Sequence, residues 1–128
     1  MIMVDIHKNS KDRITSIVVS GHAEFAEQGS DLICAAASTL VYTAIGALSD
    51  LCGLKDFYRI VDNGDPESVT FSEITVPADL SSEETICTAQ IILQTVRIGF
   101  LQLEMSVQEQ HGNQYIQVIQ TMDDNLEG

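Results

Sequence analysis

Two long stretches with helical hydrophobic spacing constrain the fold of this chain most. The first runs from about Asp31 to Leu51, is rich in alanine and apolar nearly all round, and is followed by Gly53 as a helix stop. The second begins at a capping box made by Ser81 and Glu84 and extends to about Gln110. A helix that is apolar on nearly every side must be covered on more than one side. The first helix therefore needs a sheet and a second cover, either the other helix or another subunit.

Each helix carries apolar residues at spacings of three and four, which marks the side that should face a sheet. These residues are Leu40, Val41, Ala44, Ile45, Leu48 and Leu51 in the first helix and Ile86, Ala89, Leu93, Val96, Phe100 and Leu103 in the second.

The segments between the helices are rich in β-branched residues and predict strands. Residues 2–7 and 13–20 should form a hairpin, residues 55–61 and 68–76 a second strand pair, and residues 115–121 a final strand. The order ββαββαβ predicts an α+β fold of two layers, a mainly antiparallel sheet with both long helices on one face. We expect one domain over residues 1–128, with a frayed acidic tail at about 123–128.

The chain carries 6 basic and 19 acidic residues, for a formal net charge of −13. This balance argues against direct nucleic-acid binding, because affinity for phosphates comes largely from Lys and Arg. A cationic partner is the natural counterpart. The alternative is that the acidity only keeps a small protein in solution.

The sequence also indicates the compartment. Its three cysteines have no C-x-x-C spacing, which argues against a disulfide framework or a structural zinc site. Neither a signal peptide nor a segment approaching the roughly 20 apolar residues of a membrane span is evident. We therefore expect a cytoplasmic protein with no membrane contact.

One cysteine and one histidine stand apart from the others. Cys34 falls in the first turn of the first predicted helix, where the helix dipole favours a thiolate, and Asp31 is placed to cap that turn. The strand 13–20 should deliver His22 to the edge of the sheet, across a short loop from Cys34. His22 is therefore a candidate general base. Ser38 lies one turn beyond Cys34 on the same helix face.

Simpler interpretations remain open for each of these residues. Cys34 could be a small core residue, as Cys52 and Cys87 are expected to be, and His22 a hydrogen-bonded residue at a strand end. Asp31 could orient His22 or only cap the helix, and Ser38 could bond the thiolate or pack on the sheet. A metal site at His22 and Cys34 would lack further ligands, so none is expected. The other histidines, His7 and His111, are expected to be surface residues.

The segment from Gly21 to Ser38 resembles the signature of the ribosomal-processing cysteine proteases, a family of small bacterial proteins. The matching residues are Gly21-His22-Ala23, Gly29, Asp31, Cys34-Ala35-Ala36 and Ser38. Two departures are visible: Leu32-Ile33 replaces a more usual Ile-Val, and residues 111–114 stand where the family often has Tyr-Pro before the last strand. The second departure concerns only the local turn.

The resemblance implies a homodimeric cytoplasmic endopeptidase without a cofactor. It would remove a short N-terminal extension from large-subunit ribosomal protein twenty-seven, after an aromatic residue. Cys34 and His22 would be the catalytic pair, with Asp31 and Ser38 in support. The loop from Ala23 to Ser30, which contains Phe25 and Gly29 and follows Gly21, would rearrange to admit the substrate. The basic N-terminal region of a ribosomal protein would suit the acidity of the chain.

A function of another class also fits the sequence. The chain could be a binding module or ribosome-assembly factor that holds a basic protein without cleaving it and keeps Cys34 only for packing. Incubation with the extended ribosomal protein, followed by measurement of product masses, would distinguish the two.

Overall fold

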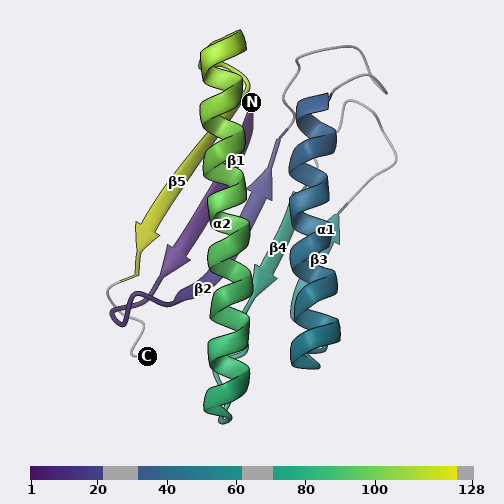
Figure 1. Cartoon of the computed structure of the whole chain (residues 1–128), viewed down its shortest axis with the longest axis vertical. Coiled ribbons are helices and arrows are strands. Elements are labelled where there is room, and N and C mark those ends of the chain that lie inside the picture. Colours follow the sequence, from purple (N-terminus) through teal and green to yellow (C-terminus); the bar gives the residue numbers. More distant parts are fainter. Residues whose placement is uncertain (22–31, 62–70, 124–128) are drawn as a thin grey trace.

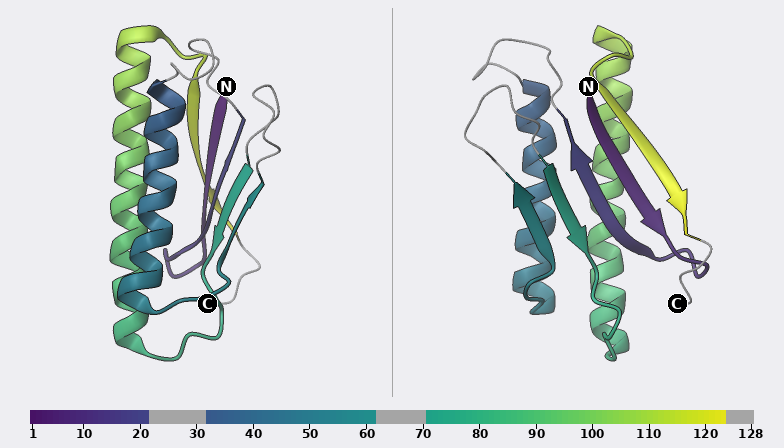
Figure 2. Two further views of the ribbon diagram at one scale, coloured as in Figure 1. Left: turned by 90° about the vertical axis from the view of Figure 1, so that its right-hand side faces the viewer. Right: turned by 180° about the vertical axis from the view of Figure 1, so that it is seen from behind.

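The computed structural model describes residues 1–21, 32–61 and 71–123. In these residues a five-stranded sheet is covered on one face by two helices (Figure 1). Figure 2 shows from the side that both helices lie on the same face of the sheet. The elements are β1 (Ile2–Lys8), β2 (Ile14–Ser20), α1 (Leu32–Cys52), β3 (Tyr58–Val61), β4 (Phe71–Thr75), α2 (Glu83–His111) and β5 (Ile116–Met122). The predicted fold class and element order are confirmed.

The strands lie in the order β3-β4-β2-β1-β5. Neighbouring strands are antiparallel, as predicted, except that β1 and β5 run parallel. A parallel pair needs a crossover, and α2 connects β4 to β5 across the helix layer. β2 is the central strand, so the expectation that it reaches the edge of the sheet is wrong.

Alternation along the strands places the core between the sheet and the helices. Ile2, Val4 and Ile6 of β1 are at most 2% exposed and point toward the helices. Ile74 of β4 and Ile116 of β5 belong to the same core cluster. Its largest fully buried side chain is Phe100, which comes from the middle of α2.

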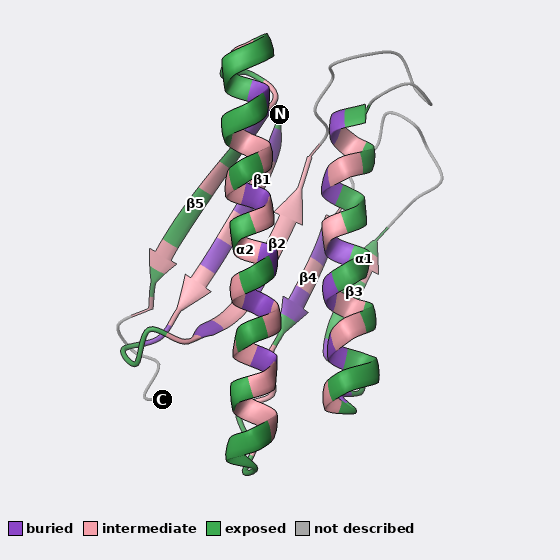
Figure 3. Ribbon diagram, in the orientation of Figure 1, coloured by how far each residue is buried: buried purple, intermediate pink, exposed green. Residues whose placement is uncertain are grey.

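The predicted apolar stripe of α2 is confirmed, whereas that of α1 needs a correction. The buried residues of α1 are Ile33, Ala37, Val41, Ala44 and Leu48, while Leu51 is 70% exposed. Steps of three and four from Ile33 to Leu48 continue to Cys52, which packs against the core at this end of the helix. Figure 3 shows the resulting alternation, with exposed positions on the outward side of both helices.

The ends of the helices explain where they start and stop. Gly53 has a φ of 68°, and its N–H and that of Leu54 donate to Ser49 and Leu48, which closes α1 as predicted. The N-cap of α2 lies one residue later than predicted. Ser82, and not Ser81, is the N-cap, and its Oγ accepts a bond of 3.3 Å from the Thr85 N–H.

Both helices are long and apolar enough to cross a membrane when judged by length and composition alone. The expectation that no segment approaches such a length was therefore wrong. In the fold, the buried side of each helix contributes to the core shared with the sheet, which is how the core helix of a globular domain packs.

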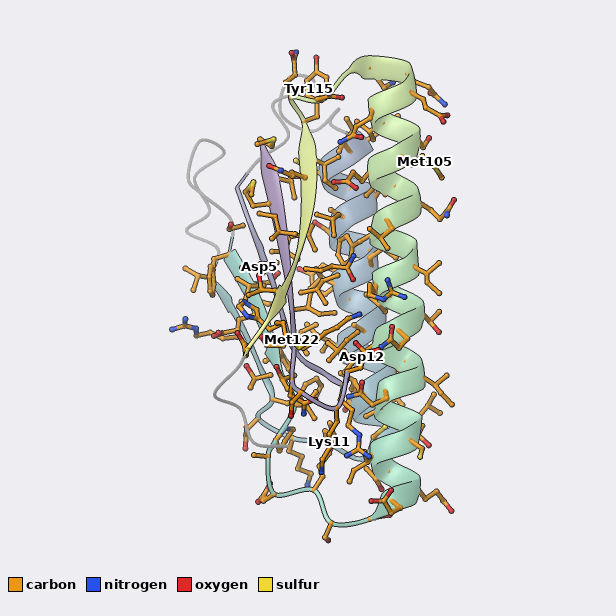
Figure 4. All side chains as sticks on the ribbon, turned by 90° about the vertical axis from the view of Figure 1, so that its left-hand side faces the viewer. Asp5, Lys11, Asp12, Met105, Tyr115 and Met122 are labelled. Atoms are coloured by element: carbon orange, nitrogen blue, oxygen red, sulfur yellow. The ribbon has the colours of Figure 1, made fainter. Side chains whose placement is uncertain are left out.

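The face of the sheet without helices carries a polar cluster around His7. Its Nε2 lies 3.2 Å from Asp5, and its Nδ1 lies 3.2 Å from Asp123. The Thr121 hydroxyl donates a bond of 3.0 Å to Asp5, which Figure 4 labels on this side of the molecule. His7 is therefore a half-buried residue with two carboxylate partners, and the expectation of a simple surface histidine is corrected.

Candidate active site

Cys34 occupies the position that the sequence predicts for it, in the first turn of α1. It is the third residue of the helix, is half-buried and packs against the edge of the core. The backbone dipoles at a helix N-terminus favour negative charge, and the effect is strongest within the first turn. A thiolate at Cys34 is therefore favoured by the local structure.

A cavity of about 80 Å³ opens beside Cys34. Cys34, Ser38 and Tyr42 follow one another at intervals of four along α1, so all three line the same side. The facing wall comes from the sheet, where Ile2, Val19, Gly21, Ile60 and Ser72 contribute. The arrangement places a sulfur atom between a helix N-terminus and a largely apolar wall.

Gly21 directly follows β2 and has no room for a side chain. Its φ is +88°, and a Cβ at this position would overlap the carbonyl oxygen of Met1. A side chain here would therefore be strained by both the backbone conformation and the contact. Gly21 lines the Cys34 cavity and immediately precedes His22 in the sequence.

The two serine residues that line the cavity differ in exposure. Ser38 is exposed on α1, whereas Ser72 on β4 is only 7% exposed. Within the described part of the chain, no group forms a hydrogen bond with the Ser72 hydroxyl. The sheet side of the cavity thus carries one enclosed polar group among apolar ones.

The cavity also contains three residues that the sequence patterns did not indicate, namely Tyr42, Ile60 and Ser72. Tyr42 could have been found, because it continues the interval of four from Cys34 through Ser38. Ser72 could not, because only the pairing of β4 with β2 and β3 brings it to this end of the molecule.

The other two cysteines lie in different environments. Cys52 is half-buried at the end of α1, and burial raises the pKa of its thiol. Cys87 on α2 is exposed, which corrects the expectation that it is a core residue. None of the three cysteines, all of which are described, forms a disulfide bond.

The structure brings together Gly21, Cys34 and Ser38 of the predicted site. The other predicted residues, His22, Ala23, Phe25, Gly29 and Asp31, lie outside the described residues, so their roles stay predictions. Among residues 1–21, 32–61 and 71–123, no group of three or more His, Cys, Asp or Glu side chains is arranged to hold a metal ion.

Comparison with known proteins gives a consistent result. The model of the family "Cysteine protease Prp" matches residues 1–115. The ribosomal processing cysteine protease Prp of Staphylococcus aureus is 29% identical over 109 residues, which is 85% of this chain and 93% of that protein. The protein of the same name from Bacillus subtilis is 31% identical over 97 residues, covering 67% of this chain and 87% of the relative.

Solved structures show the same fold. SMU.848 from Streptococcus mutans matches with a TM-score of 0.73 at 21% identity, over 96% of both chains. The S. aureus protease Prp with a covalently linked product peptide matches with a TM-score of 0.61 at 27% identity, over 94% of this chain and all of that one. Because the family model covers most of the chain and the fold agrees throughout, the chain belongs to the cysteine protease Prp family and is a thiol-dependent hydrolase of peptide bonds.

Proposed function

We propose that this protein is an endopeptidase that removes the N-terminal extension of large-subunit ribosomal protein twenty-seven, with Cys34 as nucleophile and His22 as general base. The observation that carries the proposal is the placement of Cys34 in the first turn of α1, inside a cavity that Gly21 also lines. Gly21 is covalently bonded to His22, which supports the proposal that His22 reaches Cys34. The relatives named as ribosomal processing proteases support the class of substrate.

The chemistry follows from the two side chains. His22 takes the proton of the Cys34 thiol, and the thiolate attacks the carbonyl carbon of the scissile bond. The negative charge on the carbonyl oxygen develops next to the N-terminus of α1, whose backbone dipoles stabilise it. The imidazolium then gives its proton to the leaving amine as the C–N bond breaks. Water, deprotonated by His22, attacks the thioester carbon. The C–S bond then breaks, the peptide leaves with a new carboxyl group, and the imidazolium returns its proton to the Cys34 sulfur.

The charge of the protein supports a basic substrate. A ribosomal protein terminus rich in Lys and Arg would be attracted by a chain with a net charge of −13. The cavity beside Cys34 is largely apolar, with Ile2, Val19 and Ile60 in its wall, which suits an apolar or aromatic side chain next to the cleaved bond. Charge would thus guide the terminus, and the cavity would position it.

The helix layer supports the proposal of a homodimer. Ile91, Ile98 and Met105 are exposed and follow one another at intervals of seven residues, so they form one stripe along the outer side of α2. Figure 4 shows Met105 pointing away from the sheet. The apolar face continues onto α1, where Leu32 and Leu51 are more than two-thirds exposed. An exposed apolar surface of this extent is typical of a protein interface.

The threonine hydroxyls on the two helices are bonded to carbonyl groups of their own helix. The hydroxyls of Thr39 and Thr43 donate to the carbonyl groups four residues earlier, at 2.9 and 2.7 Å. Thr88 and Thr95 do the same on α2, at 2.9 and 2.7 Å. Because each hydroxyl is bonded within its own helix, burying it in an interface would cost less than burying an unbonded hydroxyl. Asp50 is the one charged residue of α1, so this helix adds little like-charge repulsion between two acidic copies.

The cytoplasm is the proposed location, since both the expected substrate and three cysteines outside any disulfide bond fit a reducing compartment. Direct binding of nucleic acid is not expected, because the surface is strongly acidic.

The test is incubation of the protein with the extended ribosomal protein, followed by intact-mass measurement of the products. One cut that releases a short N-terminal peptide supports the proposal. Stable binding without a new mass would favour the alternative, a binding module that holds the same basic protein. If the protein neither bound nor cleaved the extended ribosomal protein, both proposed functions would be rejected.

A further inference from the structure

A second cavity lies at the end of the molecule opposite Cys34. β1 starts at Ile2 beside the Cys34 cavity and runs down to the β1–β2 hairpin, where Asn9 lines the second cavity (Figure 1). Its volume is about 710 Å³, within the range of sites that hold small molecules. The hairpin, the end of β4, the connection from β4 to α2 and the first turns of α2 form its walls.

The acidic and basic residues in the wall of this cavity differ in their pairing. Glu73 pairs with Arg59 at 3.5 Å, and Asp123 pairs with His7 at 3.2 Å, so both acidic groups in the wall have a cationic or imidazole partner. Lys11 and Arg13, which are also in the wall, have no carboxylate partner among the described residues. Figure 4 labels Lys11 at this hairpin end. Lys11 and Arg13 are therefore the two cations of this wall that form no ion pair within the described residues.

A buried amide adds fixed hydrogen-bond donors. Asn9 is 7% exposed, and its Oδ1 accepts bonds of 2.9 and 3.1 Å from the N–H groups of Lys11 and Arg13. Because both partners are donors, the oxygen must face them, and the NH₂ group must face the other way. No acceptor within the described residues binds that NH₂ group, and the residue lines the cavity. The hairpin thus holds a donor of fixed orientation beside the two cations.

The opposite wall is apolar and rigid. Val76, Pro77, Leu80 and Ile86 contribute to it, and Val76 and Leu80 pack against the core. Gln90 fixes the wall to the hairpin strand, because its amide accepts from the Ile14 N–H at 2.8 Å and donates to the Ile14 carbonyl at 2.9 Å. A ligand that fits both walls has an anionic end and an apolar body.

We propose that this cavity binds a small amphiphilic anion, a carboxylate or phosphate monoester on an aliphatic chain, with Lys11, Arg13 and the Asn9 amide at the anionic end. The proposal is independent of the protease activity, because no residue named for catalysis lines this cavity. Charge-assisted bonds from a guanidinium and an ammonium group suit both kinds of anion.

The test uses octanoate and octyl phosphate as probes with the full chain, against octanol and octyltrimethylammonium as probes of equal chain length. Binding is measured by calorimetry and located by amide shifts in ¹⁵N NMR spectra. We expect at least one anionic probe to shift the amides of residues 9–16 and 76–90, with affinity that falls as salt increases. The relative affinities of octanoate and octyl phosphate then identify the preferred anion.

Charge variants make the test specific. Lys11→Gln with Arg13→Gln should weaken binding of the anionic probe by about tenfold or more. Lys55→Gln with Arg97→Gln makes the same change in net charge at residues that lie outside the cavity and form no ion pair with the described residues of its wall, and should change affinity by less than about threefold. Equal binding of octanol and octanoate, equal effects of the two double variants, or no shifts at millimolar probe would each overturn the proposal.

Discussion

Gly21 is the residue at which local conformation and the site depend most directly on each other. Its φ of +88° and its contact with the Met1 carbonyl leave no room for a side chain. We predict that Gly21→Ala lowers the free energy of unfolding by roughly 1–3 kcal/mol and also reduces peptide cleavage. Ser20→Ala, at the adjacent position, should change stability by less than about 0.5 kcal/mol. Equal urea midpoints for Gly21→Ala and the unmodified protein would contradict this explanation.

The three thiols should be distinguishable by alkylation with iodoacetamide across pH. Cys34 should react at the lowest pH, because the α1 N-terminus favours its thiolate. Cys52 should react slowest even under alkaline conditions, because burial raises its pKa and limits access. Cys87 is exposed, so access does not limit its reaction. Peptide mass spectrometry gives the three rates, and parallel pH profiles would disprove the assignment.

The residues of the site that could be predicted are those that lie close together in sequence. Gly21, Cys34 and Ser38 were found because each is tied to a helix or strand end with a local signal. Ser72 and the pairing of His7 with Asp123 were not, since each depends on contacts between strands distant in sequence. Local patterns carry no information on such pairings, which are set by the sheet as a whole.

Element boundaries depend on which of two adjacent residues is favoured as a cap. Ser81 and Ser82 are neighbours, and only Ser82 accepts the bond from Thr85. We predict that Ser82→Ala lowers the free energy of unfolding by about 1 kcal/mol. Ser81→Ala should change it by less than about 0.5 kcal/mol. The comparison uses urea denaturation of both variants, and a larger loss for Ser81→Ala would place the cap where the sequence pattern placed it.

Both helices and the order of elements along the chain were predictable because the apolar periods of 3.6 and 2 extend over whole elements. Which residues of each helix face the core was less predictable. Leu51 has the spacing of a core residue, but α1 ends at Cys52, and the turn at Gly53 leaves Leu51 70% exposed. The parallel pairing of β1 with β5 also follows from the path of the whole chain and from no local signal.

At the scale of the molecule, the exposed apolar stripe on the outer side of α2 predicts the assembly. We expect a sedimentation mass near twice the 14.0 kDa of the chain. Ile98→Glu, in the exposed stripe of α2, should give monomers, because it introduces like charges at the interface. Ile119→Glu is the matched control, since Ile119 is exposed on β5. A monomer at micromolar concentration, or dissociation by Ile119→Glu alone, would contradict dimerisation through the helices.

The central claim is that Cys34 and His22 act as one catalytic unit, and single-turnover cleavage of the extended ribosomal protein tests it most directly. We predict that Cys34→Ala and His22→Ala each remove nearly all of the rate, and that the double variant is little worse than either, because the two groups perform one step together. Substrate affinity should stay within about threefold, because binding depends on the acidic surface and the apolar cavity wall. Cys87→Ala, which removes an exposed thiol on α2, should cleave at the unmodified rate. Cleavage by Cys34→Ala above background, with the same product masses, would contradict the account.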